Sequence, residues 1–205
     1  MSLFLTLISL VIVLASIIIH ELAHGYAADW LGDPTPRLMG RLTLNPLKHL
    51  DLMGSLVFPG LLFIMGLPVI GWAKPVPFNP LNFKKYHTWG NAIVAISGPL
   101  SNILLAIIFA VLLRVGVYAE FLTPVMTQLI VSIVLINISL ALFNLVPIPP
   151  LDGHHILFAL LSDDRFRSFK NSLIRYSLPL LVLFIIFGWR FLQPLITVVT
   201  YFLIG

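Results

Sequence analysis

The sequence predicts an all-α polytopic membrane protein, a bundle of about five to six transmembrane helices. Of its 205 residues, 59% are hydrophobic and only 10% are charged, whereas a soluble domain contains about a quarter charged residues. Several apolar stretches are also long enough to cross the roughly 30 Å hydrocarbon core of a bilayer. No internal repeat or low-complexity tract divides the chain, so we expect residues 1–205 to form a single intramembrane domain.

The first half of the chain contains one clear helix followed by an irregular region. The helix is expected from about Leu3 to Leu31, ending at the sequence Gly-Asp-Pro. Residues 54–70 are apolar but interrupted by glycines and prolines, and residues 71–80 (GWAKPVPFNP) contain too much proline for a helix interior. We therefore expect a re-entrant or extended segment near residues 54–80.

The second half of the chain contains more regular spans. Residues 91–117 and 127–146 each suit a transmembrane helix, and the second is followed by a proline-rich stretch (PIPPLDG). A charged loop at residues 163–175 leads to two last hydrophobic segments, at about 177–188 and 191–204. Together with the first helix and the irregular region, these segments give the expected number of crossings.

The basic residues predict how the chain crosses the membrane. If residues 54–70 dip into the bilayer and return, ten of the twelve lysines and arginines lie on one face, and only Arg114 and Arg190 lie on the other. The ten are Arg37, Arg41, Lys48, Lys74, Lys84, Lys85, Arg165, Arg167, Lys170 and Arg175. Cytoplasmic loops carry an excess of such residues, so we expect this face in the cytosol and the N-terminus outside. A full crossing stays open, because a 17-residue helix spans about 25 Å.

Composition excludes several classes of protein. The chain has no cysteine, which excludes disulfides, thiolate metal sites and a cysteine nucleophile. The formal charge is only +4 and no run of lysine or arginine resembles a nucleic-acid-binding patch. The first apolar run lacks a basic start and a small-residue cleavage site, so we expect a retained span rather than a removed signal peptide.

The most informative motif, HELAH at residues 20–24, lies within this first apolar run. Ionisable residues at membrane depth are rare and usually functional. On a helix, His20 and His24 lie one turn apart on the same face, so both imidazoles can bind one metal ion, and Glu21 is placed beside them to hold a water molecule. The motif therefore indicates a zinc site within the bilayer.

A catalytic zinc ion usually has three protein ligands, so a third must come from elsewhere in the chain. Asp152 is favoured because it ends the proline-rich stretch, where an unwound helix is tolerated only inside protein or around a watery cavity. An ordinary helix cap is the alternative role for Asp152. The other histidines are interpreted as solvated loop residues (His49 and His87) or as polar residues at an interfacial helix start (His154 and His155).

Three motifs together carry a resemblance to a known family. HELAH, SGPLSN (97–102) and NLVPIPPLDGHH (144–155) resemble, in order, those of the site-2 protease family of intramembrane zinc metalloproteases, in its compact form without a PDZ domain. The resemblance covers nearly the whole chain. It implies that His20, His24 and Asp152 bind one catalytic zinc ion and that Glu21 is the general base and acid toward a zinc-activated water. The implied reaction is hydrolysis of peptide bonds in or near transmembrane segments, that is, regulated intramembrane proteolysis.

Two asparagines also match polar positions of the family, and each has two possible roles. Asn102 either donates a hydrogen bond to the oxyanion or the substrate, or forms an inter-helix hydrogen bond. Asn144 either supports a metal ligand or caps the backbone of the unwound stretch. Ser97-Gly98-Pro99 is interpreted as a site of close helix packing rather than chemistry.

Two other classes of function compete with a protease. A metal transporter would use the histidines and the aspartate as a transit site, but the chain lacks the paired repeats and the line of polar positions that a transporter shows. A membrane scaffold with a structural zinc would not need Glu21. We therefore expect a transmembrane protein substrate and the lipid bilayer as partners, no nucleic acid, and a multi-pass location in a prokaryotic plasma membrane. The substrate's identity and the oligomeric state do not follow from the sequence.

Overall fold

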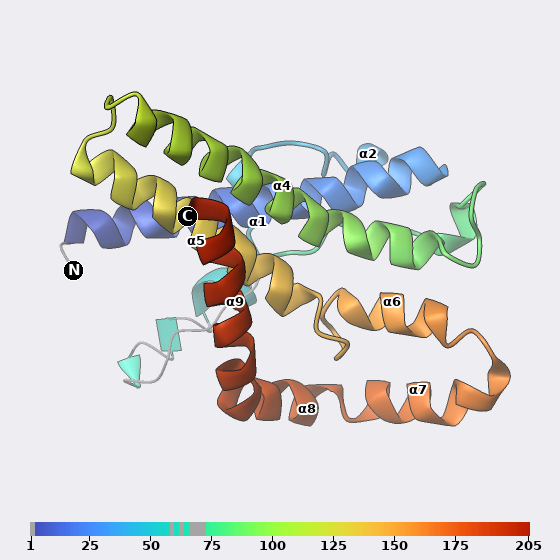
Figure 1. The fold of residues 1–205 in the computed structure, drawn as a ribbon. Helices are drawn as coiled ribbons and strands as arrows, with labels where there is room; N and C mark the ends of the chain where they lie inside the picture. Colours follow the sequence, from blue (N-terminus) through green and yellow to red (C-terminus); the bar gives the residue numbers. More distant parts are fainter. Residues whose placement is uncertain (1–2, 58–59, 62–63, 66–72) are drawn as a thin grey trace.

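The computed structural model describes residues 3–57, 60–61, 64–65 and 73–205 (Figure 1). Over these residues the chain is largely helical and contains no β-strand, which confirms the predicted all-α class. Four helical stretches in this part are long and apolar enough to cross a membrane: Leu7–Leu31, Gly90–Tyr118, Pro124–Asn144 and Ser177–Ile204. Residues 54–70, where a re-entrant segment was expected and a full crossing stayed open, lie in large part outside the described residues.

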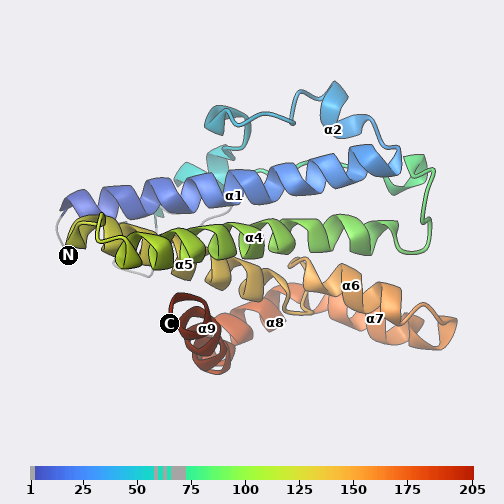
Figure 2. The same cartoon turned by 45° about the horizontal axis from the view of Figure 1, so that its top comes forward.

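Three long helices form the body of the molecule. α1 (Leu3–Leu31) and α5 (Pro124–Asn144) both pack against α4 (Gly90–Tyr118), and the three run alongside one another in Figures 1 and 2. Small residues dominate the buried face of α4, because they allow the backbones of membrane helices to approach closely. These residues include Gly90, Ala92, Ala95, Gly98, Ala106, Ala110 and Gly116.

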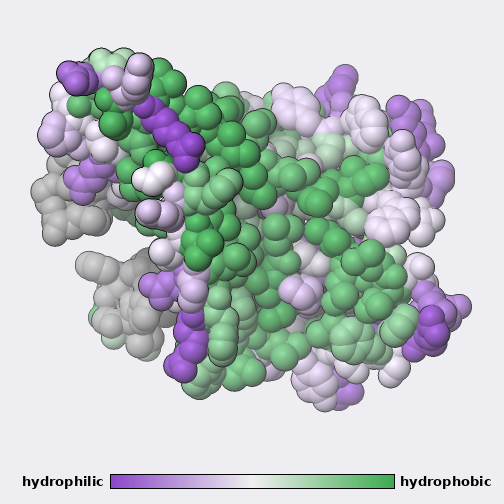
Figure 3. Space-filling view, in the orientation of Figure 1, coloured by the Kyte–Doolittle hydropathy of each residue, from purple (hydrophilic) through white to green (hydrophobic). Residues whose placement is uncertain are grey.

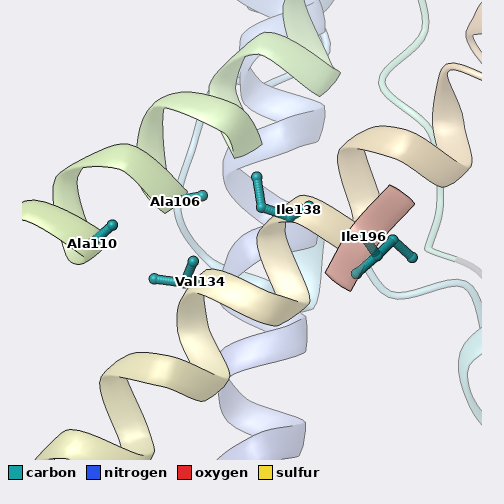
Figure 4. Close-up of a cluster of buried hydrophobic side chains, with 5 residues drawn as sticks. All are labelled: Ala106, Ala110, Val134, Ile138 and Ile196. Atoms are coloured by element: carbon teal, nitrogen blue, oxygen red, sulfur yellow. The ribbon is translucent and has the colours of Figure 1, made fainter. Parts of the chain in front are cut away.

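A hydrophobic core lies where the C-terminal helix α9 (Trp189–Ile204) crosses this bundle (Figure 4). Ala106 and Ala110 of α4 meet Val134 and Ile138 of α5 in this core, and α9 contributes Ile196. The small side chains on α4 leave room for the branched side chains of the other two helices.

The surface has the distribution expected for a protein surrounded by lipid. In Figure 3, hydrophobic residues cover most of the middle of the visible face, and hydrophilic residues gather toward the two ends of the long helices. Many large apolar side chains of the spans are exposed, among them Leu104, Val111 and Phe202. An apolar belt of this kind is stable only in a bilayer or its equivalent, so the protein is an integral membrane protein.

The chain between α1 and α4 leaves and returns to the same end of the bundle. Helix α1 stops at Leu31, where Gly32 has a φ of +110°, which glycine adopts without strain. At the end of the region, the amide of Lys84 donates to the carbonyl of Leu31 at 2.8 Å. This hydrogen bond brings the two ends of the region together at the same end of the bundle. The described elements of the region are α2 (Thr35–Leu38), η1 (Pro46–Lys48), η2 (Leu52–Val57), the non-helical residues 73–79 and η3 (Pro80–Asn82).

The C-terminal third follows α5 through a proline-rich turn and folds back along the bundle (Figure 1). Its short elements are α6 (Gly153–Leu160), η4 (Asp164–Phe166), α7 (Arg167–Arg175), α8 (Ser177–Leu183) and η5 (Phe184–Gly188). The two expected hydrophobic segments correspond to α8 with η5 and to α9. The π-helical turn η5 bends the chain between them, so α9 crosses α5 instead of continuing along α8 (Figures 1 and 2).

Candidate metal centre

The two histidines of α1 project together into the interior of the bundle. His20 and His24 are only 6% and 8% exposed, and their Nε2 atoms lie 3.0 Å apart. The helical spacing of four residues places them on one face, as the sequence predicted. Asp152 approaches the same point, with its carboxylate oxygens 3.1 Å from Nε2 of His20 and 3.3 Å from Nε2 of His24.

Asp152 is delivered by the turn that separates α5 from α6. Helix α5 ends at Asn144, and the prolines that follow cannot donate the amide hydrogen bonds of a continuing helix. Gly153 then packs directly against the backbone carbonyl of Leu145, where a Cβ atom would collide. Asp152 precedes the first residue of α6, but its side chain makes no capping hydrogen bond. The carboxylate therefore points toward the histidines rather than serving as a helix cap.

Hydrogen bonds to the outer ring nitrogens fix how each histidine is protonated. Nδ1 of His20 donates to the side-chain oxygen of Asn102 at 2.6 Å, and Nδ1 of His24 donates to the backbone carbonyl of Val94 at 2.7 Å. Both partners are acceptors, so each Nδ1 carries the proton and each Nε2 presents a lone pair. Such partners orient metal-binding histidines and raise their basicity.

These three residues fit a zinc ion. Two Nε2 lone pairs and a carboxylate facing one another at 3.0–3.3 Å repel unless a cation lies between them. Tetrahedral zinc with bonds of about 2.0–2.1 Å holds its ligand atoms roughly 3.3 Å apart, close to the observed spacing. Within the described part of the chain, His20, His24 and Asp152 are the cluster of histidine and acidic residues whose ligand atoms converge in this way.

Helix α4 passes very close to the two histidines. A Cβ atom built on Gly98 would lie 2.5 Å from Nε2 of His24 and 2.6 Å from Nε2 of His20. The sequence Ser97-Gly98-Pro99 therefore serves close approach of α4 to α1, in agreement with its interpretation as a packing motif.

Glu21 lies beside the cluster and lines the same cavity. The cavity has a volume of about 230 Å³ and is bounded by α1, α4, residues 75–78 and the turn that carries Asp152. One carboxylate oxygen of Glu21 accepts a hydrogen bond from the amide of Val76 at 2.8 Å. Glu21 is thus held at the wall of the cavity, near the cluster but outside it.

Asn102 and Asn144 occupy different positions around the cluster. The amide nitrogen of Asn102 donates to the side-chain oxygen of Asn137 at 2.8 Å and to the carbonyl of Ser16 at 3.4 Å. Asn102 is fully buried and orients His20, so its donors do not face the cavity. Asn144 does line the cavity, and its amide donates to the carbonyl of Leu140 within its own helix.

Of the remaining histidines, His49 differs from its sequence-based interpretation in how far it is exposed to solvent. His87 is exposed, as expected. His49 is only 1% exposed and binds the carbonyl of Thr43, so its interpretation as a solvated residue is wrong. His154 contacts the carbonyl of Leu151. His155 lines the cavity, and its ring packs against that of His154 with centroids 3.9 Å apart and the planes tilted by 37°.

Two buried polar residues of this region were not singled out from the sequence. Asn137 is fully buried in α5 and links Asn102 to the hydroxyl of Ser16. Its signal in the sequence was a lone asparagine inside an apolar span. Arg41 is 5% exposed and binds two backbone carbonyls next to the cavity. The sequence indicates Arg41 only as one of the basic residues that set the topology.

Comparison with known proteins adds independent information. The model of Peptidase family M50 matches residues 8–121 and 116–187. The chain is 44% identical over 149 residues to a protein named "Putative zinc metalloprotease YwhC" from Bacillus subtilis, which covers 70% of this chain and 64% of that protein. It is 30% identical over 158 residues to "Putative zinc metalloprotease Rip2" from Mycolicibacterium smegmatis, covering 76% of this chain and 58% of the relative. It is also 30% identical over 190 residues to the protein of the same name from Mycobacterium tuberculosis, covering 87% and 68%.

The relatives extend beyond the region that this chain matches. The chain spans 64% and 58% of the lengths of the first two relatives. No solved structure matches the chain.

Proposed function

The chain belongs to peptidase family M50, and we propose that it is a zinc metalloprotease that hydrolyses peptide bonds in or near the transmembrane segments of other membrane proteins. One observation carries this proposal. His20, His24 and Asp152 converge with three ligand atoms, and Glu21 lines the same cavity inside a bundle of membrane-spanning helices. A structural zinc site would not require a carboxylate beside the ligands that is not itself a ligand.

The residues of the cavity divide the work of peptide hydrolysis. Zinc bound to His20, His24 and Asp152 supplies a Lewis acid that polarises the scissile carbonyl and acidifies the attacking water. Glu21 accepts a proton from that water as its oxygen bonds to the carbonyl carbon, and returns the proton to the leaving nitrogen as the C–N bond breaks. No acyl-enzyme is formed. Asn102 and the carbonyl of Val94 hold the proton of each imidazole on Nδ1 and keep the two Nε2 atoms directed at the cluster.

The substrate must be locally extended before it can react. In a helix every carbonyl accepts a hydrogen bond, so a scissile bond within a helix is shielded. Residues 73–79 supply a backbone edge with which an extended substrate can pair. Phe78 of this segment lines the cavity, and its amide and carbonyl have no hydrogen-bond partner within the described part of the chain. An extended peptide can pair with such an edge. We therefore expect substrates that carry a helix-breaking Gly, Pro or Asn near the cleaved bond.

We place the active site toward the cytosol of a prokaryotic plasma membrane. The return of the chain between Leu31 and Lys84 keeps the basic residues of that region on one side, and the positive-inside rule assigns that side to the cytosol. The matched relatives come from bacteria, which supports a prokaryotic setting. Cleavage at this depth would release the cytosolic part of a substrate, which is the output of regulated intramembrane proteolysis.

The proposal is tested by cleavage of a single-span reporter by purified, zinc-loaded protein, with Glu21→Gln and Asp152→Asn beside the wild type. The wild type should cut the reporter and a chelator should stop it. Glu21→Gln should lose at least about a hundredfold in rate, in line with the usual contribution of a general base, while its zinc content stays at one ion per chain. Asp152→Asn should lose both cleavage and zinc, because a ligand is weakened.

Two results would contradict the proposal. Full activity in Glu21→Gln would remove the general base from the mechanism. Unchanged zinc affinity in Asp152→Asn would remove that residue from the metal centre. An exposed acidic control, Asp164→Asn, should leave both cleavage and zinc binding unchanged, because this residue lies in η4 and does not line the cavity.

A further inference from the structure

The first part of the segment 73–79 is hydrogen-bonded to the chain that follows α2. Nη2 of Arg41 donates to the carbonyl of Lys74 at 2.6 Å and to the carbonyl of Pro75 at 3.0 Å. On the same stretch, the amide of Lys74 donates to the carbonyl of His49 at 2.8 Å. The backbone groups of residues 74 and 75 are therefore occupied by the loop.

The next residue faces the cavity instead. The amide of Val76 donates to Glu21 at 2.8 Å, and Pro77 has no amide hydrogen to offer. Val76 itself is 5% exposed, and Phe78 stacks on Phe83 with ring centroids 6.0 Å apart. Arg41 thus fixes the backbone immediately before the amide that holds Glu21.

Arg41 binds these two carbonyls with a guanidinium group that is buried in the protein. It is 5% exposed, its Nε has no partner within the described part of the chain, and its two side-chain hydrogen bonds there are to neutral carbonyls. Burying a guanidinium without a carboxylate partner is unfavourable, so the contact with the two carbonyls needs a compensating role. The backbone holds it in place: Gly40 has a φ of +61° and the amide of Arg41 donates to the carbonyl of Pro36 at 2.9 Å.

We propose that Arg41 is a positioning residue for catalysis. By clamping the carbonyls of Lys74 and Pro75, it sets the backbone that carries the Val76 amide to Glu21 and presents Phe78 to an extended substrate. This inference rests on the proposed protease function. Arg41 touches neither the zinc ligands nor the substrate itself; it acts through the 73–79 residues.

The test compares Arg41→Ala with Arg37→Ala in the full-length, zinc-loaded protein. Arg37 is the matched control, because it lies four residues earlier, is 70% exposed and pairs with Asp29 on the surface. With the single-span reporter, Arg41→Ala should lose roughly tenfold to a hundredfold in kcat/KM, the scale of a small misplacement of reacting groups, and Arg37→Ala should match the wild type. Zinc content should be unchanged in both variants.

A rescue experiment separates positioning from general damage. Free guanidinium ion at millimolar concentration should restore part of the activity of Arg41→Ala, because it can refill the space beside the two carbonyls. Wild-type activity in Arg41→Ala would overturn the inference. Loss of zinc from Arg41→Ala, or loss of activity without any rescue, would reduce Arg41 to a structural residue and would also overturn it.

Amide hydrogen exchange provides a readout that does not depend on proteolysis. In Arg41→Ala the amides of Lys74 and Val76 should exchange at least tenfold faster than in the wild type, and in Arg37→Ala they should not. If the wild type cleaves no reporter, the proposed function fails while this measurement still decides the role of Arg41. Unchanged exchange in Arg41→Ala would overturn the clamp itself.

Discussion

His20 and His24 show how much of a metal site is specified by residues that never touch the metal. Each imidazole has one nitrogen directed at the ligand cluster and the other bound to a fixed acceptor, Asn102 or the carbonyl of Val94. Asn102 is fixed in turn by Asn137, which binds Ser16. A chain of buried polar groups thus runs from the cluster into the apolar core, where each unpaired group would be costly.

Gly98 is a residue at which a single methyl group should disturb the metal centre directly. In Gly98→Ala the new Cβ would lie about 2.5 Å from both Nε2 atoms, too close for α4 to keep its position. We expect Gly98→Ala to lose zinc binding and reporter cleavage by at least tenfold each, since displaced ligands weaken zinc and displaced groups slow catalysis. Zinc affinity measured by chelator competition checks this prediction.

A second glycine provides the control for that measurement. A Cβ atom on Gly60 would meet no atom of the described residues within 4 Å, so Gly60→Ala should bind zinc as the wild type does. Wild-type zinc affinity in Gly98→Ala would show that α4 can move away from the histidines without cost, and the prediction would then be wrong.

The two histidines among the candidate ligands could be predicted from the sequence because their evidence is local. Two histidines at a spacing of four, with a glutamate between them, lie on one helical face wherever the helix is placed. Their supporting groups could not be predicted in this way. The carbonyl of Val94 belongs to the backbone and has no signal in the sequence, and the partners of Asn137 and Arg41 become apparent only when helices far apart in the chain are packed together.

At the scale of elements, Asp33 connects the end of α1 to the 73–79 residues and η3. It is fully buried and accepts hydrogen bonds from the amide and hydroxyl of Thr35, the amide of Asn79 and the side chain of Asn82. Burial alone would raise the pKa of Asp33, but these hydrogen bonds, with that from Asn82 the largest, outweigh it and lower the pKa below 3.8.

From the lowered pKa of Asp33 we predict how residues 73–82 respond to acid. Because the folded pKa of Asp33 is lowered, its stabilising contribution is complete above about pH 4 and is lost as the pH falls through the folded value. Limited proteolysis between residues 73 and 82 should therefore accelerate several-fold at pH 3 relative to pH 6. In Asp33→Asn the same region should be sensitive already at pH 6, and the pH dependence should largely disappear. An acid response that persists unchanged in Asp33→Asn would assign it to another group.

The elements themselves followed from the sequence to different degrees. The end of α1 at Leu31 and the start of α4 near residue 90 were predicted because glycine, proline and a change from apolar to polar residues mark them. The bend at η5 was not predicted: the residues Phe184–Gly188 are apolar like their neighbours, and the change of direction results from α9 packing across α5 and α4.

At the scale of the whole molecule, the orientation in the membrane can be measured because the chain contains no cysteine. His87 lies at the end of the bundle where α4 begins, and the exposed Tyr118 lies at the end where α4 stops. With the active site toward the cytosol, a membrane-impermeant maleimide should label Tyr118→Cys in intact cells and His87→Cys only after permeabilisation. The opposite pattern would reverse the proposed orientation.

A third position extends that experiment to the C-terminal part of the chain. Ser168 is exposed on α7, which follows α5 and α6 and lies at the end of the bundle where α4 begins (Figure 1). Ser168→Cys should therefore behave as His87→Cys does. Labelling of Ser168→Cys in intact cells together with protection of His87→Cys would mean that α4 and α5 do not form a simple pair of crossings.

The 132 positions that separate His20 from Asp152 in the sequence have a consequence for biogenesis. The ribosome inserts α1 into the membrane long before it synthesises the turn that carries the third ligand. During that interval the two histidines have only the partners that α4 provides, and a nascent chain ending before residue 152 presents an incomplete set of ligands. The candidate metal site can therefore be completed only after residue 152 has been synthesised and has reached α1 and α4.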